Sequence, residues 1–297
     1  MMTQAPRSSR GEAPRDRERT TTVSLAADRR LTYAAYGPAG GTPVVFLHGT
    51  PGSRRLGELF EAAAREHGIR ILAPDRPGYG RSSPWPERSV RDAERFVAPV
   101  LDDVGVDAAG LVAFSGGAPY AFAAAATRPD RIERVDVVAG APPPEFVDET
   151  PAVQRLLRGM ATTTPALLRG AFRAQAWLAR RRDPSFVLAQ YTTGDTAATV
   201  PERAAEMVRE DFLEAVAHHR SGVVTEFGHA GSDWGVDLGE IGADVRLWHG
   251  ERDTNVPISG VRRFASSLPA AELRVFDDAD HLRTLLRSVP EILAEHQ

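Results

Sequence analysis

Ser115 stands where an apolar run, residues 111–114, gives way to an alanine-rich run that opens with Gly116 and Gly117. Such a junction is typical of a strand that turns sharply into a helix. The turn needs small neighbours, because larger side chains would collide with the backbone. It would lift the serine hydroxyl clear of the sheet and place it at a helix N-terminus, where backbone N–H groups favour developing negative charge. The pattern predicts a nucleophilic serine, with an ordinary turn serine as the alternative.

Two further polar residues follow apolar runs nearer the C-terminus. Asp253 lies in a glycine-bearing loop after one such run, and His281 comes shortly after the last one. A serine hydroxyl is a poor nucleophile until a histidine accepts its proton. The histidine in turn needs a carboxylate that fixes its tautomer and stabilises the imidazolium. Ser115, Asp253 and His281 are thus residues of the types that this chemistry needs. Glu251 is the alternative acid, and a helix cap or a surface carboxylate is the alternative role for Asp253.

The elements that would position these residues alternate along the chain. Short apolar runs are typical of strands buried on both faces, as in a parallel sheet. They comprise residues 44–47, 69–73, 110–114, 135–138, 245–248 and 273–276. Two earlier runs, 22–26 and 31–36, predict a hairpin. Stretches with helical period lie between the strands, at residues 56–66, 89–103, 117–127, 258–267 and 282–295. This order predicts an α/β fold with a mostly parallel central sheet flanked by helices.

The alternation stops between residues 142 and 241, where we find only helical patterns. The expected helices are residues 152–160, 166–181, 184–190, 202–209 and 212–227. We therefore expect an all-helical cap at 142–241, inserted into a core made of residues 21–141 and 242–297. The large apolar residues of the cap should mostly pack between its helices, with some facing the serine. They are Met160, Leu167, Leu168, Phe172, Trp177, Phe186, Tyr191, Phe212 and Phe227.

The surroundings of Ser115 resemble the nucleophile elbow G-x-S-x-G of the α/β-hydrolase superfamily, with Ala113 in place of the first glycine. Ser115, Asp253 and His281 also follow that family's order of nucleophile, acid and base, so the resemblance implies that the three act together. The resemblance implies two oxyanion donors, the backbone N–H groups of Thr50 and Gly116. It also places the general base at His281, where family members usually carry glycine just before the histidine. Here Asp280 takes that place, and it would either favour the imidazolium or point to solvent.

Two more segments carry the resemblance. Residues 75–82 resemble the family's D-x-x-G-x-G-x-S segment, which implies an architectural Asp75 that bonds local amides. Residues 115–120 resemble the S-G-G-x-P-Y runs of bacterial esterases and peptidases of this fold. In the same family an insertion before the acid folds over the nucleophile as a cap. His48 should shape its loop and not act as a base. His229 should be exposed, with a place in the pocket wall as the alternative.

Composition limits the function classes. The formal net charge of -4 predicts no global attraction to nucleic acid or to an anionic membrane. The absence of cysteine excludes disulfides and thiolate metal sites and fits a cytoplasmic location. No apolar run approaches the roughly 20 residues of a membrane span. Residues 1–20 read as a disordered tail. We expect no cofactor and no metal, because the adjacent His218 and His219 would point to different sides of a helix.

These observations predict a serine hydrolase that cleaves a carboxylic ester, thioester or lactone of a small to medium hydrophobic substrate. The expected partner is a small molecule, and the sequence leaves monomer and homodimer open. One alternative is an aminopeptidase or amidase that resembles proline iminopeptidases. That enzyme would need acidic cap residues for a substrate amine, for instance Glu202, Glu206, Glu210 or Glu214. The sequence is also compatible with biosynthetic acyl transfer or cyclisation, and with a non-catalytic binding protein on the same fold.

Overall fold

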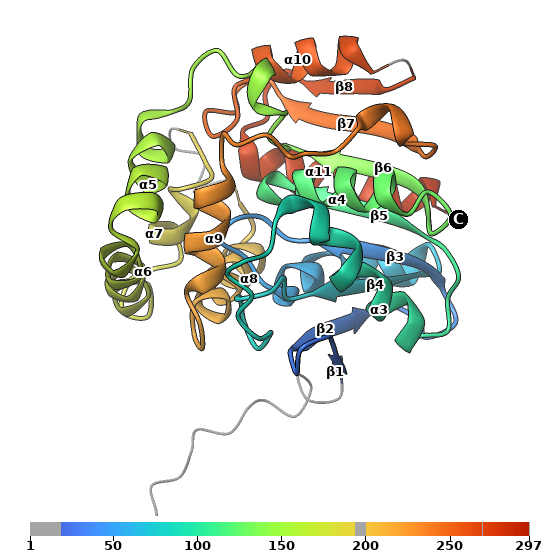
Figure 1. Ribbon diagram of the computed structural model, residues 1–297, viewed down its shortest axis with the longest axis horizontal. Helices are drawn as coiled ribbons and strands as arrows, with labels where there is room; N and C mark the ends of the chain where they lie inside the picture. Colours follow the sequence, from blue (N-terminus) through green and yellow to red (C-terminus); the bar gives the residue numbers. More distant parts are fainter. Residues whose placement is uncertain (1–18, 194–199, 269, 297) are drawn as a thin grey trace, which may run out of the picture.

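A single eight-stranded sheet lies at the centre of the computed structural model, which describes residues 19–193, 200–268 and 270–296. Its strand order is β1-β2-β4-β3-β5-β6-β7-β8. The β1–β2 and β2–β4 pairs are antiparallel, and the remaining pairs are parallel. The predicted α/β fold with a mostly parallel sheet is confirmed (Figure 1).

Each strand contains most or all of an apolar run that predicted it. The bounds are β1 Thr20–Ser24, β2 Arg30–Tyr36, β3 Thr42–Leu47, β4 Ile69–Pro74, β5 Ala109–Phe114, β6 Ile132–Val138, β7 Asp244–Gly250 and β8 Glu272–Phe276. The central strand β5 is buried along its whole length, as expected for a strand covered on both faces. Each fully buried aliphatic side chain in such a strand stabilises the fold by about 1.5–3 kcal/mol.

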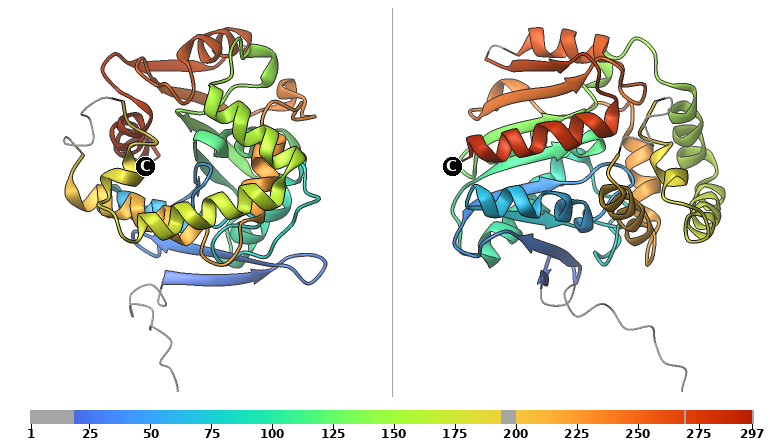
Figure 2. Two further views of the ribbon diagram at one scale, coloured as in Figure 1. Left: turned by 90° about the vertical axis from the view of Figure 1, so that its left-hand side faces the viewer. Right: turned by 180° about the vertical axis from the view of Figure 1, so that it is seen from behind.

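Helices of the core cover both faces of the sheet (Figures 1 and 2). One face carries α3 (Glu94–Asp103), α4 (Ala118–Thr127) and α10 (Ile258–Ser267), and the other carries α2 (Glu61–Glu66) and α11 (His281–Glu295). The two expected helices at 56–66 and 89–103 begin as 3-10 turns, η1 (Arg54–Phe60) and η2 (Val90–Ala93). Two separate hydrophobic clusters result, one on each side of the strands.

Between β6 and β7 the described residues form helices and turns but no strand. The longer helices are α5 (Ala152–Thr163), α6 (Pro165–Ala179), α8 (Glu202–Ala215) and α9 (Ser221–His229), with the single-turn α7 (Ser185–Leu188) between α6 and α8. Short 3-10 turns, η4 (Pro144–Phe146) and η6 (Leu238–Glu240), lead into and out of this segment. These helices lie together across one end of the sheet (Figure 1; Figure 2, left).

The expected break between the last two helices of this segment, at 209–212, was wrong. Helix α8 runs on to Ala215 because Phe212 and Ala215 are buried in the hydrophobic cluster. The chain breaks instead at 216–220, before Gly222. The N–H of Gly222 donates to the Gly78 carbonyl at 3.1 Å, and a Cβ at Gly222 would lie 2.6 Å from the Tyr79 ring. The glycine therefore lets α9 start in direct contact with the core.

At the N-terminus, Thr20 opens β1 and so does not belong to the predicted tail at 1–20. The rest of that tail, residues 1–18, lies outside the described residues. None of the helices described has the length and apolar composition needed to cross a membrane.

Candidate active site

Ser115 lies at the junction of β5 and the 3-10 turn η3 (Ser115–Gly117), which leads into α4. Its backbone has a φ of 52°, in the left-handed region that non-glycine residues rarely adopt. Such a conformation costs about 1–3 kcal/mol and persists only where the surroundings impose it. A Cβ on Gly117 would lie 2.7 Å from the Leu47 carbonyl oxygen. The close approach of β3 therefore requires a glycine, and this fixes the turn.

The structure brings the three predicted residues into one chain of hydrogen bonds. Ser115 Oγ lies 2.9 Å from His281 Nε2, and His281 Nδ1 lies 2.7 Å from Asp253 Oδ2. An ionised carboxylate only accepts, so Nδ1 carries the proton and Nε2 is left to accept from the serine hydroxyl. Asp253 and His281 are both buried. This arrangement has the geometry that a general base and its orienting acid require.

Backbone groups hold Asp253 in place. Its Oδ1 accepts from the N–H groups of Asn255 at 2.8 Å and Val256 at 2.9 Å. Burial acts to raise the pKa of Asp253, but the charge and hydrogen bond of His281 outweigh it and lower the pKa below its usual value. The carboxyl group is therefore ionised at neutral pH. Glu251, the alternative acid, instead forms an ion pair with Arg262 at the protein surface.

Asp280, which departs from the family pattern, is buried and does not point to solvent. Its side chain is the N-cap of α11, with Oδ1 accepting from the N–H of Arg283 at 2.9 Å. Its Oδ2 accepts from the N–H of Thr193 at 3.2 Å. A carboxylate at a helix N-terminus is favoured by the unpaired N–H groups there. Asp280 thus anchors the start of the helix that carries His281.

The loop after β3 brings Thr50 to Gly116. The backbone nitrogen of Thr50 lies 3.4 Å from the point where a Cβ on Gly116 would sit, and the Thr50 Cβ lies 2.8 Å from it. The two predicted N–H donors are therefore neighbours beside Ser115. His48 shapes this loop, as expected. Its Nδ1 bonds the Gly49 carbonyl at 2.8 Å and its Nε2 accepts from the N–H of Arg76 at 3.1 Å. Burial and the charge of Arg76 hold its pKa well below the usual value.

A buried carboxylate from α9 clamps the same loop. Glu226 accepts from the Thr50 hydroxyl at 2.5 Å and from two nitrogens of Arg76 at 2.7 and 2.9 Å. Arg88 and Tyr79 donate to it as well, at 2.7 and 2.9 Å. Although burial opposes ionisation, the two arginines lower the pKa of Glu226 to about 2. Arg76 also bonds the carbonyl oxygens of the loop. We call Glu226, Arg76 and Arg88 the Glu226 cluster.

Two more buried acids tie the loops near the site together. Asp75 accepts from the N–H groups of Arg54 at 2.7 Å and Arg81 at 3.0 Å, which confirms its architectural role. Asp211 on α8 accepts from the N–H and hydroxyl of Ser53 at 2.8 and 2.7 Å. Burial raises the pKa of Asp211 to about 7, against these hydrogen bonds.

Local sequence patterns carry no signal for the Glu226 cluster. Arg76 and Arg88 lie 150 and 138 residues before Glu226 in the chain. Glu226 itself belongs to an ordinary helical pattern. Arg76 is part of the recognised segment 75–82, but nothing in that segment indicates its partner. His229 was expected to be exposed and is half-buried, with Nδ1 3.1 Å from the Tyr120 hydroxyl. Among the described residues, no group of three or more His, Asp or Glu could hold a metal ion.

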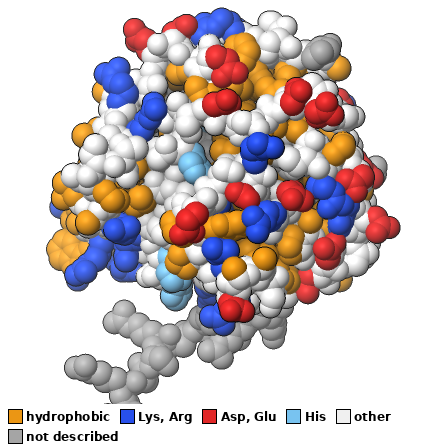
Figure 3. Space-filling view, in the orientation of Figure 1, with side chains coloured by type: hydrophobic (Ala, Val, Ile, Leu, Met, Phe, Trp, Pro, Cys, Tyr) orange, Lys and Arg blue, Asp and Glu red, His pale blue; other side chains and the backbone are white. Residues whose placement is uncertain are grey.

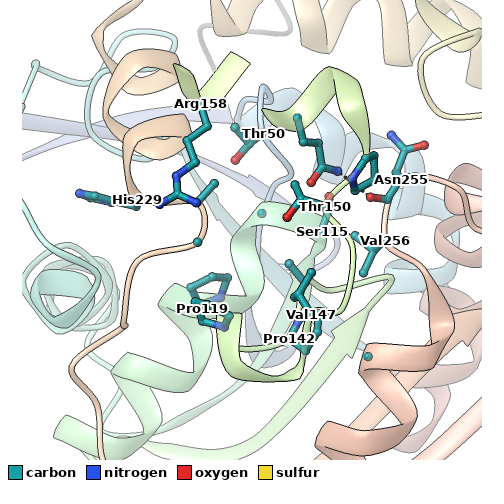
Figure 4. Close-up of a pocket in the computed structure, with 18 of the residues that line it drawn as sticks. Thr50, Ser115, Pro119, Pro142, Val147, Thr150, Arg158, His229, Asn255 and Val256 are labelled. Carbon is teal, nitrogen blue, oxygen red and sulfur yellow. Dashed lines mark hydrogen bonds between the residues drawn. The ribbon is translucent and has the colours of Figure 1, made fainter. Parts of the chain in front are cut away.

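Ser115 opens into a pocket of about 630 Å³ between the sheet and the helices that follow β6 (Figure 4). Pro119, Pro142, Val147 and Val256 lie around the serine together with Thr50, Thr150 and Asn255, and Arg158 and His229 line another part of the wall. Of the nine large apolar residues named for the predicted cap, Phe227 lines the pocket. Those that belong to the core cluster or pack against it are Met160, Leu168, Phe172, Phe186, Tyr191, Phe212 and Phe227 itself. Leu167 and Trp177 do neither, because 63% and 53% of their surfaces are exposed.

Replacing Glu226 by alanine leaves two buried guanidinium groups without their counter-charge. Breaking a buried ion pair in this way costs about 3–5 kcal/mol. We therefore expect E226A to lower the free energy of unfolding in urea by about that amount. The control E202A, at an exposed position on α8, should change it by less than about 0.5 kcal/mol. An E226A protein as stable as the E202A protein would contradict the cluster's role.

Asp211 predicts a specific pH dependence of stability. Its pKa of about 7 in the folded protein exceeds the value of about 3.9 in an unfolded chain. The folded state thus binds the Asp211 proton more tightly than the unfolded state does. The contribution of Asp211 to the free energy of unfolding therefore falls as pH rises from about 4 to about 7 and is constant above that. In D211N the amide oxygen still accepts from Ser53. We expect the free energy of unfolding of this variant, measured in urea, not to decline over that pH range. The exposed control D107N should retain the decline, and an unchanged decline in D211N would contradict the prediction.

The chain resembles known proteins over most of its length. A sequence profile of the alpha/beta hydrolase fold matches residues 42–285. A 2-hydroxy-6-oxononadienedioate/2-hydroxy-6-oxononatrienedioate hydrolase of Paraburkholderia phymatum is 29% identical over 252 residues, 82% of each protein. A non-heme chloroperoxidase of Streptomyces lividans is 26% identical over 277 residues, 92% of this chain and 96% of that protein.

The solved structures agree on the fold. An enol-lactonase from Burkholderia xenovorans superimposes with a TM-score of 0.70 at 20% identity, covering 93% of this chain and 99% of that one. The sequence profile spans the strands from β3 to β8 together with Ser115, Asp253 and His281. The chain is therefore a member of the α/β-hydrolase fold family and a hydrolase of that family.

Proposed function

We propose that this protein is a serine hydrolase that cleaves a carboxylic ester, thioester or lactone through an acyl-enzyme. Ser115 is the nucleophile, His281 the general base and Asp253 the acid that orients the base. The observation that carries the proposal is the hydrogen-bonded chain from Ser115 Oγ through His281 to Asp253 at the floor of a pocket. The left-handed backbone of Ser115 supports it, because it aims the hydroxyl away from the sheet.

In the first half of the reaction, Ser115 Oγ attacks the substrate carbonyl carbon while its proton moves to His281 Nε2. The carbonyl electron pair moves to oxygen and forms a tetrahedral oxyanion. As this intermediate collapses, the bond to the leaving group breaks and His281 gives its proton to the departing oxygen or sulfur. In the second half, water attacks the acyl group, His281 takes its proton, and the acid is released as Oγ regains its hydrogen.

The oxyanion needs donors that are already in place. We assign this role to the backbone N–H groups of Thr50 and Gly116, which meet beside Ser115. Such a donor contributes on the order of 3 kcal/mol to the transition state. The Glu226 cluster supports this arrangement, because it ties the Thr50 side chain and the preceding carbonyl groups to the core and to α9.

The pocket favours an apolar acyl group. Its wall near the serine contains Pro119, Pro142, Val147 and Val256 (Figure 4), with Phe227 and Trp234 in the same lining. Pockets of this size and character hold small to medium organic molecules. We assign residues 142–241 the role of a cap that limits acyl length. The absence of cysteine supports a cytoplasmic site of action.

The acidic cap residues suggested for the aminopeptidase alternative, Glu202, Glu206, Glu210 and Glu214, do not line the described pocket. An aminopeptidase would need an acidic residue free to hold a substrate amine. Glu206, Glu210 and Glu214 instead form ion pairs with arginines. Three other acids line the pocket: Arg76 and Arg88 neutralise Glu226, Arg263 pairs with Asp148, and Glu149 is exposed to solvent. An ester or lactone needs no such group.

Hydrolysis of p-nitrophenyl esters from acetate to laurate tests the proposal. We expect a maximum at one acyl length, because the cap closes the pocket, and a loss of at least about 10⁴-fold in S115A. The matched control S266A, on the exposed face of α10, should keep the wild-type rate. A folded S115A protein that retains the activity would show that another group carries the reaction.

A further inference from the structure

The outward face of α6 carries two large apolar side chains that the packing does not use. Leu167 and Trp177 are 63% and 53% exposed. The other three tryptophans, Trp85, Trp234 and Trp248, are each at most 7% exposed. At helical spacing, Leu167, Gly170, Ala174 and Trp177 follow one another on a single face (i, i+3, i+7, i+10). The opposite face, with Leu168, Phe172 and Ala176, is buried.

Arginines flank this apolar face. Arg173 and Arg180 lie four residues before and three residues after Trp177, so both adjoin the indole on the helix surface. Arg181 stacks on the indole, with its guanidinium carbon 4.0 Å from the ring centre. The whole segment 151–182 contains seven arginines and no acidic residue, although the chain as a whole has a net charge of -4. Figure 3 shows hydrophobic and basic side chains together at its left edge, where α6 lies in Figure 1.

Arg220 approaches Arg173 and Arg180 from the turn between α8 and α9. Burial, and then the charges of Arg173 and Arg180, lower the pKa of the Arg220 guanidinium. The Arg220 Nε is buried without a hydrogen-bond partner among the described residues. Among the residues that the structure describes, Arg173, Arg180 and Arg220 form no ion pair. Elsewhere the protein pairs its buried arginines, as in the Glu226 cluster and in the Arg54–Asp75 pair. We call Leu167, Arg173, Trp177, Arg180 and Arg220 the α6 face.

We propose that the α6 face docks on the surface of an anionic phospholipid bilayer. Three uncompensated guanidinium groups match the phosphates of the headgroup layer, and each bound basic residue strengthens such an interaction by roughly fivefold. The exposed indole of Trp177 suits the membrane–water interface, because its apolar ring can contact the lipid while its N–H remains hydrated. A basic helix with Trp and Leu on its outer face has the pattern of an interfacial helix.

A nucleic acid would satisfy the arginines but would leave Leu167 in water. A second copy of the chain would bury the apolar residues but would bring two sets of unpaired arginines together. The surface of an anionic bilayer would contact both the arginines and the apolar side chains of the α6 face. The overall charge of the chain does not oppose it, because charges beyond about 8 Å are screened at physiological salt.

Tryptophan emission gives a site-specific test with the full-length protein. Because Trp177 is the exposed tryptophan, we expect a blue shift when vesicles containing phosphatidylglycerol are added, and none with pure phosphatidylcholine. The shift should be absent in W177F, and binding should weaken as salt is raised. A blue shift of equal size with both vesicle types would overturn the role assigned to the arginines.

Co-sedimentation with the same vesicles gives the affinity. We expect R173E/R180E to bind more than about 20-fold more weakly than the wild type, since two contributions of roughly fivefold each are lost or reversed. The control R65E/R91E carries the same change in net charge on α2 and η2 and should bind within about threefold of the wild type. Ester hydrolysis in solution should be unchanged in both variants, which shows that they are folded.

Three results would overturn the proposal. They are no binding to phosphatidylglycerol vesicles, equal binding by wild type and R173E/R180E, and tighter binding to duplex DNA than to the vesicles. Sedimentation of the free protein as a dimer that R173E/R180E dissociates would assign the α6 face to self-association instead. S115A should bind vesicles as the wild type does, so that the outcome is independent of the proposed chemistry.

Discussion

The left-handed backbone of Ser115 is the constraint on which the site depends. With φ at 52°, the chain turns sharply at Ser115, where β5 ends and the 3-10 turn η3 begins. The conformation is intrinsically unfavourable, so neighbouring contacts must impose it. Gly117 lets β3 approach within a distance that no side chain would allow, and Gly116 does the same for Thr50. The proposed nucleophile and the two proposed oxyanion donors are thus positioned by this one turn.

The helices between β6 and β7 are tied to the core at the same place. Glu226 from α9 meets Arg76, Arg88 and the Thr50 hydroxyl, and Asp211 from α8 meets Ser53 on the same loop. Buried charges are tolerated only when they are paired and hydrogen-bonded. Displacing α8 or α9 would therefore disturb the loop that carries Thr50. Helix α9, which lines the pocket, and the loop that carries Thr50 are thus connected by hydrogen bonds and ion pairs, although they come from distant parts of the chain.

The fold could be predicted well from the sequence because each strand and most helices have a local signature. All eight strands overlap the apolar runs, and Ser115, Asp253 and His281 could be found because each follows a strand of a parallel sheet. The misses have a common physical origin. The Glu226 cluster, the end of α8 and the capping role of Asp280 depend on contacts between distant segments, and local patterns carry no information about them. Leu167 and Trp177 were expected in the cap interior because hydrophobicity alone does not tell which face of a helix is covered.

The net charge of -4 is a sum over the whole chain, so it does not show that residues 151–182 contain no acidic residue. The central claim, however, concerns Ser115, and covalent labelling tests it most directly. Wild-type protein is treated with a fluorophosphonate, digested, and analysed by mass spectrometry for the modified peptide. The proposed mechanism predicts one phosphonyl group per chain, attached to Ser115, with loss of esterase activity in proportion to labelling. A protein that hydrolyses esters yet carries no label, or carries it on another residue, would contradict the account.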